Sequence, residues 1–589
     1  MFKNVAVTGL LSMSLGLGAC GGGGGGATEP ITVSFGTSPP ASLSLSDTAS
    51  MTALIGNDPA QAGANWTVSC AAADCGSFNP VSTASGVTTV YTPPAALPSP
   101  ATVKIMASSA TDGTKSVSAS IALTAAAGPA LADGTYVFHL GGVDGNGAYY
   151  VAGAFKVSGG LIVAGEQDFT DAVYGSHDSL VPDGSSLKVS GGNIQIEIAT
   201  ANSRVGVSGI ETLRGTVVSP TRILISQFDA SATATGSIDL QTSVAQPSGG
   251  YAFAVQGNDT GNGNALVMGG ILSFTGTTLA VGGSVFDLND GGAVLENQTF
   301  ASGTVSAPDA LGRVSIALAP SSVSQVPAVI FTAYIVGPGR LQLIEDQSDA
   351  LNANLGGTAL GQGANSGKFT MASVSGASYA HGTIGADGNG PLTLAGGFGL
   401  NADGTVSGRM AFVDGANHQG NDISGSYTVA ANGRVSLRQI SLATTGVTLN
   451  FALYLDGNGN GLVLGIDSFE VSQGLAFAQT SSAPLSGAYG LSTLGAWSSG
   501  SFSAVGPVRV ANGSFSGSTD YNNDGQLMPN VTLGGSQISS SGELQLTGLS
   551  GDATTGSTWG YYPIDASRTL AIEVDGQQLG LLWLEAQSQ

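Results

Sequence analysis

The chain has 589 residues, of which 91 are glycine and only 9% are charged. Its length allows about four to six domains. The 16 Lys and Arg residues stand against 39 Asp and Glu residues, so the formal net charge is −23. This balance argues against nucleic acid and anionic lipid surfaces as partners. The abundant glycine and dispersed apolar residues are typical of a β-rich protein rather than a disordered one.

The first residues have the features of a secretory signal peptide. Lys3 supplies a positive charge, and the apolar stretch from Val5 to Leu17 is too short to span a bilayer. The sequence LGAC at residues 17–20 resembles the lipobox of bacterial lipoproteins. The resemblance implies that residues 1–19 are cleaved off, and that Cys20 carries a diacylglyceryl group and an acylated amine, with palmitate as a typical acyl chain.

A Gly-rich tether is expected at residues 20–30, because such a chain is flexible. In lipobox proteins an aspartate directly after the cysteine favours the inner membrane, whereas Gly21 stands here and favours the outer membrane. We therefore expect a lipid-anchored envelope protein on the periplasmic or the exposed face of that membrane. The membrane is its partner through Cys20. An ordinary signal peptide with an incidental cysteine is the alternative.

Residues 31–125 contain about seven short strand-like runs punctuated by Pro, Asn, Gly and Asp, which predicts a β-sandwich. We expect a disulfide between Cys70 and Cys75, because an exported protein meets an oxidising compartment. The run from Trp66 to Pro93 (WTVSCAAADCGSFNP…TTVYTPP) resembles bacterial Ig-like domains of surface proteins. The resemblance implies a spacer or adhesion module.

The rest of the chain compares well with itself. Four segments open alike, at tyrosines that are 115, 128 and 110 residues apart. Four landmarks recur in order: the opening tyrosines Tyr136, Tyr251, Tyr379 and Tyr489; the aspartates Asp168, Asp287, Asp414 and Asp520; the hairpin residues Arg204, Arg313, Arg434 and Glu543; and the closing glutamines Gln241, Gln362, Gln479 and Gln587. The sequence thus predicts four copies of one module, at residues 133–242, 249–362, 377–479 and 487–589.

Each repeat is expected to be an antiparallel up-and-down β-barrel. The first contains about eight strand-like runs joined by tight turns, including one at residues 204–210, and closure would remove the two bare edges of such a sheet. The likeness to avidin or lipocalin is one of topology only. The predicted fold class is therefore all-β: an Ig-like β-sandwich followed by four repeated barrels on a string. Propeller blades and a transmembrane barrel fit the repeat length and the 6% aromatic content less well.

Candidate chemical sites are sparse. The loops that start at Asp456 and Asp520 match the first half of a calcium loop, but Asn, Asp and Gly are also turn residues, so we expect turns and no metal. No Gly-x-Ser-x-Gly or His-Glu-x-x-His motif occurs. Four histidines fall at unmatched positions of the repeats and are expected to be surface or satisfied residues: His139, His177, His381 and His418. The acidic residues Glu296, Glu345 and Asp346 occur in one repeat alone.

These patterns favour a non-enzymatic, lipid-anchored surface protein that displays adhesion or binding modules on an Ig-like stalk. We expect no cofactor and no catalytic residue. Two alternatives stay open. Small or glycan ligands could bind in the barrel mouths, unless large apolar side chains fill the interiors. A glycan-active enzyme would need a carboxylate pair about 5–10 Å apart in a groove. The sequence names neither a protein partner nor a small-molecule ligand.

Overall fold

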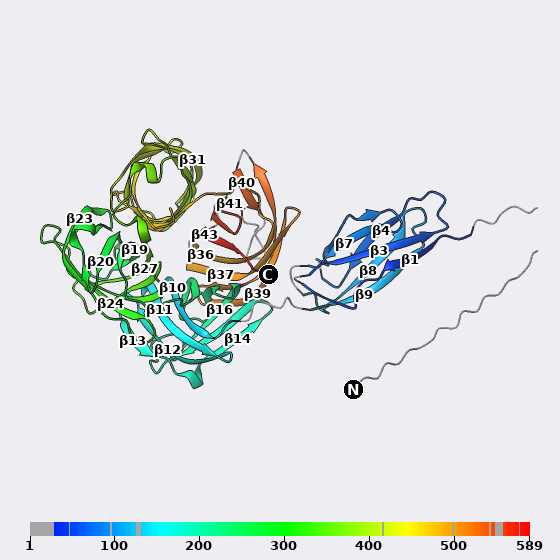
Figure 1. Ribbon diagram of the computed structural model, residues 1–589, viewed down its shortest axis with the longest axis horizontal. Helices are drawn as coiled ribbons and strands as arrows, with labels where there is room; N and C mark the ends of the chain where they lie inside the picture. Colours follow the sequence, from blue (N-terminus) through cyan, green and yellow to red (C-terminus); the bar gives the residue numbers. More distant parts are fainter. Residues whose placement is uncertain are drawn as a thin grey trace, which may run out of the picture. The chain divides into compact units, whose positions relative to one another are not determined.

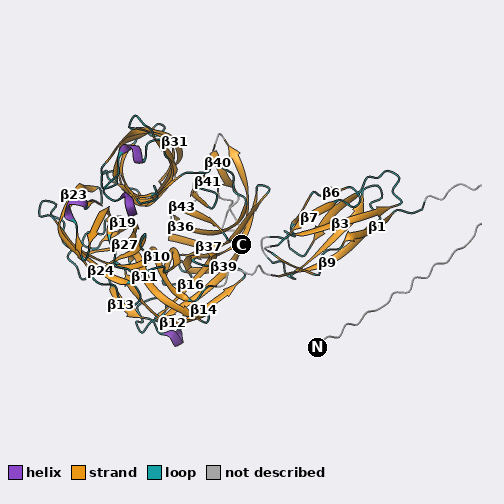
Figure 2. Cartoon of the chain, in the orientation of Figure 1, coloured by secondary structure: helices purple, strands orange, loops and turns teal. Residues whose placement is uncertain are grey.

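The computed structural model describes residues 29–45, 47–72, 74–94, 97–124, 131–414, 417–497, 500–540, 543–547, 558–575 and 578–588. These residues form an all-β structure with a few short 3₁₀ turns, as Figure 2 shows. None of those turns is long and apolar enough to cross a bilayer. The chain divides into two compact units. The first comprises Met1–Leu43, Thr48–Thr92 and Thr102–Ala122, and the second comprises Ser44–Asp47, Pro93–Ala101 and Leu123–Gln589.

The N-terminal strands form two antiparallel sheets. One sheet has the order β1 (Thr32–Thr37), β3 (Ala49–Gly56), β7 (Thr88–Thr92) and β5 (Ser77–Asn79). The other has the order β2 (Ser42–Ser44), β9 (Ser116–Thr124), β8 (Thr102–Ser109), β4 (Ala64–Ser69) and β6 (Ser82–Thr83). Trp66, Phe78 and Tyr91 stack in series in the core, because inward and outward residues alternate along these strands. Cys70 and Cys75 form a disulfide in the loop after β4.

The second unit contains four modules, which follow one another in the colours of Figure 1 from cyan to red. Module I has the strands β10 (Gly134–Asp144), β11 (Gly147–Ser158), β12 (Leu161–Thr170), β13 (Gly175–Ser179), β14 (Ser186–Ser190), β15 (Asn193–Ala199), β16 (Ile210–Ser219), β17 (Arg222–Gln227) and β18 (Ala232–Leu240), with η1 at Pro182–Gly184. Module II has β19 (Gly249–Asp259), β20 (Ala265–Thr275), β21 (Thr278–Leu279), β22 (Val285–Asp290), β23 (Ala293–Val305), β24 (Arg313–Pro320), β25 (Val329–Gly337), β26 (Arg340–Glu345) and β27 (Ala353–Gly361), with η2 at Val281–Gly283.

Modules III and IV have eight strands each. Module III has β28 (Ser378–Asp387), β29 (Gly390–Leu400), β30 (Thr405–Asp414), β31 (Asn417–Val429), β32 (Arg434–Leu442), β33 (Thr448–Leu455), β34 (Gly461–Gly465) and β35 (Glu470–Ala478), preceded by η3 (Gly363–Asn365) and η4 (Met371–Ser373). Module IV has β36 (Gly487–Trp497), β37 (Gly500–Ala511), β38 (Ser514–Asn523), β39 (Gln526–Ser540), β40 (Glu543–Thr547), β41 (Thr558–Pro563), β42 (Arg568–Glu573) and β43 (Leu579–Ala586).

The modules are antiparallel barrels or close to it. Modules III and IV are closed eight-stranded barrels, and in module II the pairings β19–β20 and β22–β23 complete a ring. Module I is a nine-stranded sheet whose ends meet through a bridge between Leu180 and Thr200. The expected strand at residues 204–210 is wrong: Gly206, Ser208 and Gly209 have positive φ, so this segment turns. Two strands that were not expected, β13 and β14, lie between β12 and β15, and the polar β13 has no apolar alternation to reveal it.

The interior of each module is filled by its own apolar core. Module I encloses Tyr136, Phe138 and Phe155, which are fully buried, and the other three modules have equivalent clusters of Tyr, Phe, Leu and Val. A cavity within module IV measures only about 30 Å³. This packing argues against ligands in the barrel mouths.

The modules do not form beads on a string, which corrects the sequence-based expectation. Separate buried apolar clusters join module I to II, II to III, III to IV, and IV back to I. The fourth of these joins Val218 and Leu224 of module I to Val505 of module IV. The second unit is therefore a closed ring of four modules, because the outer faces of neighbouring sheets are apolar and bury one another.

Candidate ligand cavity and the interfaces that enclose it

The repeated aspartate and arginine meet across the interface between modules I and II. Asp168 on β12 accepts hydrogen bonds from Nε and Nη2 of Arg313, both at 2.7 Å, and from the hydroxyl of Tyr334 at 2.6 Å. Burial by itself raises the pKa of Asp168, but the hydrogen bonds from Arg313 and its neighbours outweigh burial and lower it. The carboxylate is thus held charged inside the interface.

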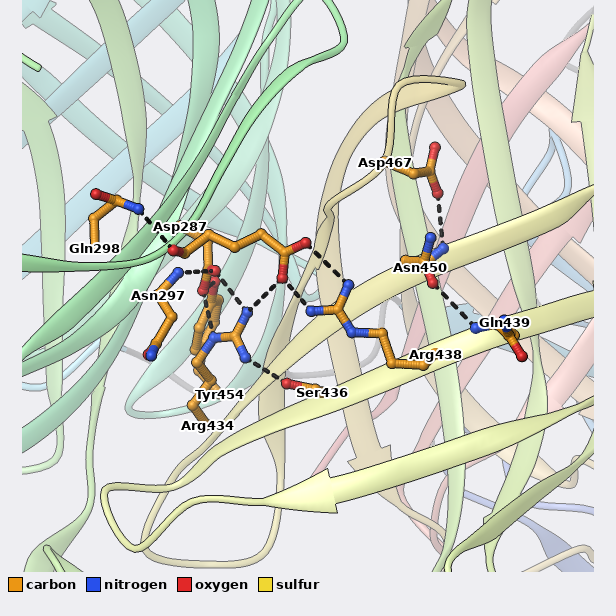
Figure 3. Close-up of polar contacts among 11 residues, drawn as sticks. Asp287, Asn297, Gln298, Arg434, Ser436, Arg438, Gln439, Asn450, Tyr454 and Asp467 are labelled. Carbon is orange, nitrogen blue, oxygen red and sulfur yellow. Dashed lines mark hydrogen bonds and ion pairs between the residues drawn. The ribbon is translucent and has the colours of Figure 1, made fainter. Parts of the chain in front are cut away.

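The same arrangement recurs between modules II and III (Figure 3). Asp287 on β22 accepts hydrogen bonds from Nε and Nη2 of Arg434 at 2.7 and 2.6 Å, and from the hydroxyl of Tyr454 at 2.6 Å. The side chains of Arg434 and Asp287 retain only 7% and 0% of their exposed surface. Glu296 adds a second carboxylate, which binds Arg438 of module III through both oxygens.

A glycine before each arginine makes this contact possible. Gly312 and Gly433 have φ values of 86° and 95°, a conformation that few other residues adopt. A Cβ atom at either position would also lie 2.5 Å from the Nε2 atom of the closing glutamine of the preceding module, Gln241 or Gln362. The Gly-Arg pair of the repeat therefore serves two contacts at once.

The closing glutamines link all four modules in sequence order. Gln241 donates to Ile335 O at 2.7 Å, Gln362 to Leu455 O at 2.9 Å, Gln479 to Pro563 O at 2.6 Å and Gln587 to Val217 O at 3.0 Å. Each glutamine follows the last strand of its module. The last of these bonds runs from module IV back to module I, so Gln587 closes the ring.

At the interface between modules IV and I, a different arginine takes the role that Arg313 and Arg434 have at the two interfaces above. Arg214, not Arg204, binds Asp520 of module IV, at 3.1 Å, whereas Arg204 lies over the ring of Tyr174 in its own module. Asn522 donates to Gln227 O, Asp229 O and Ala232 O of module I, as Asn289 does to module III. Asp414 accepts a bond from Asn389 of its own module, and the side chain of Glu543 lies outside the described residues.

The ring encloses a cavity of about 650 Å³ that is lined by all four modules. Equivalent positions of the repeat point into it. The residues two places before the closing glutamines are Asp239, Leu360, Phe477 and Glu585, and those at or directly before the start of the last-but-one strands are Arg222, Arg340, Asn460 and Arg568. The four copies thus place chemically different side chains at the same location in the ring. The residues that the copies share, by contrast, hold the modules together.

A charged cluster occupies one part of the lining. Arg222 donates from Nε and Nη2 to Glu585 of module IV, at 2.6 and 2.7 Å, and from Nη1 to Asp239 at 2.7 Å. Arg340 of module II approaches the other oxygen of Asp239 at 3.4 Å. Burial alone would raise the pKa of Asp239, but Arg340 and Arg222 lower it. This carboxylate is therefore held ionised and is poorly suited to act as a general acid.

An aromatic and aliphatic wall occupies another part. Phe477 of module III and Trp583 of module IV meet edge to face, with ring centroids 5.3 Å apart. Arg568 lies 4.9 Å from the centroid of Phe477 and is itself paired with Asp565. The wall continues over the aliphatic residues Leu224, Leu360, Ile384, Leu475 and Leu581. Such a mixture of apolar lining and a few polar groups is typical of sites for small organic ligands.

The residues singled out from the sequence fall in several places. Cys20 lies outside the described residues. Asp520 and Asn522 serve the interface rather than a calcium loop, and Asp456 accepts backbone N–H bonds from Asn458 and Asn460 in a turn. Within the described residues, no group of three His, Cys, Asp or Glu side chains could hold a metal ion.

The histidines and the acidic residues of module II also separate. His139 lines the cavity and has no hydrogen-bond partner for Nε2 among the described residues, unlike the expectation, and burial lowers its pKa to about 4. His177 lies beside Asp168, and Nδ1 of His381 contacts Gly396 O. The side chain of His418 is not described. Glu345 is buried in module II, away from Glu296, and Asp346 caps a turn.

Sequence reasoning missed the cavity residues, among them Asp239, Phe477 and Glu585. Their signal is positional: aligning the four repeats on their closing glutamines places Asp239, Leu360, Phe477 and Glu585 in one column. These residues differ between the copies, so a search for shared residues passes over them.

The chain matches no known protein family, and no curated protein is significantly similar to it. Among solved structures, it is similar to two mutants of the vaccine antigen Transferrin Binding Protein B from Haemophilus parasuis Hp5. The double mutant Tyr-167-Ala and Trp-176-Ala has 8% identity and a TM-score of 0.12, and the mutant Trp-176-Ala has 8% identity and a TM-score of 0.13. Both matches cover 78% of this chain and 77% of the other. TM-scores this low assign neither a fold nor a function.

Proposed function

We propose that this chain is a non-enzymatic, lipid-anchored protein of the cell envelope whose four modules form one ligand-binding head. The observation that carries the proposal is the central cavity, to which every module contributes side chains from the same two positions of the repeat, most of them charged or aromatic. A repeat used for display alone has no need to vary its residues at one shared place. The ligand site moves, in this proposal, from the barrel mouths to the centre of the ring.

The remaining parts of the proposal concern the cellular location of the protein and its membrane anchor. Cys20 carries the lipid anchor, residues 20–30 are the tether, and the first unit is an Ig-like spacer. The disulfide between Cys70 and Cys75 suits an oxidising compartment outside the cytoplasm. The outer membrane is the favoured location because Gly21, and not an aspartate, follows the cysteine.

The non-enzymatic assignment rests on how the shared residues are used. The repeated Asp, Arg and Gln side chains hold modules together, as Asp168, Arg313 and Gln241 do between modules I and II. Three carboxylates line the cavity: Asp239 and Glu585 are bound to Arg222, and Asp456 accepts backbone N–H bonds within a turn. A glycosidase needs one carboxyl group that keeps a proton for the leaving oxygen, and Asp239 is held ionised instead.

Membrane fractionation tests the proposed lipid anchor. The wild-type protein is expected in the carbonate-washed membrane pellet and the Cys20→Ser variant in the soluble fraction, because the acyl chains are the anchor. The control variant Ser514→Ala, which keeps Cys20, should remain in the membrane pellet like the wild type. A Cys20→Ser variant that still pellets after the wash contradicts the lipid anchor.

The neutral fluorescent probe N-phenyl-1-naphthylamine tests the cavity. Ser492 lines the cavity from module IV and is buried, whereas Ser514 on the same module is exposed. Probe fluorescence should rise on addition of the wild-type protein or of Ser514→Trp. The affinity for the probe should be about tenfold lower with Ser492→Trp, because the larger side chain fills the cavity. Equal binding by the two tryptophan variants, or no binding at all, contradicts a ligand-binding head.

A further inference from the structure

Three arginines line the cavity, and two of them form close bidentate ion pairs with a carboxylate. Arg222 forms three hydrogen bonds of 2.6–2.7 Å to Glu585 and Asp239. Arg568 donates from Nε and Nη2 to Asp565 at 2.9 and 2.7 Å and packs over Phe477. In both arginines the edge formed by Nε and Nη2 is therefore already occupied by a carboxylate.

Arg340 is the exception. Its nearest carboxylate oxygen among the described residues is Asp239 Oδ2, at 3.4 Å, and its Nε atom has no hydrogen-bond partner there. Asp239 is in turn bound by Arg222 at 2.7 Å and by the hydroxyl of Ser237 at 2.8 Å. A guanidinium carries five N–H donors, so most of the capacity of Arg340 is unused.

The side chain of Arg340 lines the cavity and retains 34% of its exposed surface. Its Nε atom is nevertheless buried without a partner among the described residues. Such a donor is costly, because the protein does not replace the hydration that it loses. A ligand oxygen placed against Arg340 would recover that cost.

The charges around Arg340 limit the ligand to a single negative charge. Arg222 and Arg340 are already balanced by Asp239 and Glu585, so each further negative charge is in excess in this cluster. A dianion such as phosphate would bring two, into a cavity that three carboxylates, Asp239, Asp456 and Glu585, already line. A carboxylate brings one and matches the planar fork of a guanidinium.

The rest of the lining describes the body of the ligand. The wall of Phe477, Trp583 and Leu581 is apolar, and the cavity of about 650 Å³ is the size of a small organic molecule. We propose that the cavity binds an amphipathic organic monocarboxylate, with its carboxylate on Arg340 and its aliphatic or aromatic body against this wall. The proposal rests on the proposed function, because it assumes that the central cavity admits ligands.

Competition against the bound neutral probe tests the charge preference. Decanoate, decanol and decylamine share one chain length and differ in the polar group. With wild-type protein, decanoate is expected to displace the probe at a concentration about tenfold lower than decanol, because the carboxylate gains hydrogen bonds to a charged donor. Decylamine is expected to be the weakest competitor.

Variants of Arg340 complete the test. Arg340→Gln should abolish the preference for decanoate over decanol, and Arg340→Lys should keep part of it, because lysine retains the charge without the fork. Arg204→Gln, far from the cavity lining in module I, should leave the preference unchanged. Thermal melting of each variant establishes that it is folded.

The two proposals fail in different ways. If decanol competes as well as decanoate with wild-type protein, or if Arg340→Gln keeps the preference, the carboxylate assignment is wrong although the cavity binds ligands. If a neutral glycan such as maltose displaces the probe better than decanoate, the site is a sugar site instead. If the probe itself does not respond to Ser492→Trp, the ligand-binding head is wrong as well.

Discussion

Asp168 and Arg313 are 145 residues apart in the sequence and form a bidentate ion pair across two modules, with both N–O distances at 2.7 Å. The pair is built from two landmarks of a repeat that looked purely internal to each copy. Asp287 and Arg434 repeat it at the next interface. The repeat therefore encodes contacts between copies as well as the fold of one copy.

Arg313→Gln is expected to destabilise the second unit by about 3 kcal/mol, because it leaves Asp168 charged, largely buried and without its guanidinium. Urea unfolding followed by circular dichroism measures the loss. Arg204→Gln is the matched control, since Arg204 lies at the surface of module I, and should change the stability by less than about 0.5 kcal/mol. Equal effects of the two variants would show that the interface pair does not support the ring.

Gln587→Ala is expected to loosen the closure of the ring. The substitution removes hydrogen bonds from Nε2 to Val217 O and to the hydroxyl of Thr216, worth about 1 kcal/mol. Hydrogen exchange should become faster in β16 of module I, which carries both acceptors, and stay unchanged in β24 of module II. Unchanged exchange in β16 would mean that Gln587 is dispensable for closure.

The sequence predicted the local structure of the modules better than their assembly. Alternating short strands and Gly-rich turns identified all-β modules, because side-chain alternation along a strand is a local property. The landmarks Asp168, Arg313 and Gln241 were found but not understood, since their partners lie in another copy and no local spacing joins them. The polar strand at Gly175–Ser179 was missed, because it pairs through its backbone and buries little apolar surface.

The residues that line the cavity could not be predicted from the sequence, for a different reason. Arg340 and Trp583 belong to separate copies, and their proximity follows only once the ring is closed. His139 was expected to be a surface or satisfied residue, and its neighbour in space is Arg340 of the next module, as the effect of Arg340 on its pKa shows. Residues that vary between copies carry no repeat signal, although here they line the common site.

The disulfide and its effect on stability can be tested independently of ligand binding. Mass spectrometry of the mature protein should find Cys70 joined to Cys75, and Cys70→Ser with Cys75→Ser should lower the stability of the first unit by about 2 kcal/mol, the value for a short loop. The fluorescence of Trp66, which packs in that unit, reports its unfolding when the other tryptophans are replaced by phenylalanine. Free thiols in protein isolated from the cell envelope contradict the pairing.

Stability is expected to fall as the pH rises from 5 to 9, because several buried carboxyl groups keep their protons in the folded state. Burial, with the charge of Asp349, raises the pKa of Glu345 to about 9, and burial raises that of Glu470 to about 8. A carboxyl group in the unfolded chain ionises near pH 4.3. Between these values the unfolded state binds fewer protons than the folded state, so the free energy of unfolding decreases with pH.

Glu345→Gln separates this effect from the others. Glutamine cannot ionise, so the variant should lose the part of the pH dependence due to Glu345, about 1.4 kcal/mol per pH unit between pH 5 and 9, and should be more stable than the wild type at pH 9. Urea unfolding of the second unit at pH 5, 7 and 9 measures the slope. Glu29→Gln, at an exposed position, is the control and should keep the wild-type slope. A Glu345→Gln variant with that same slope would place the proton on another group.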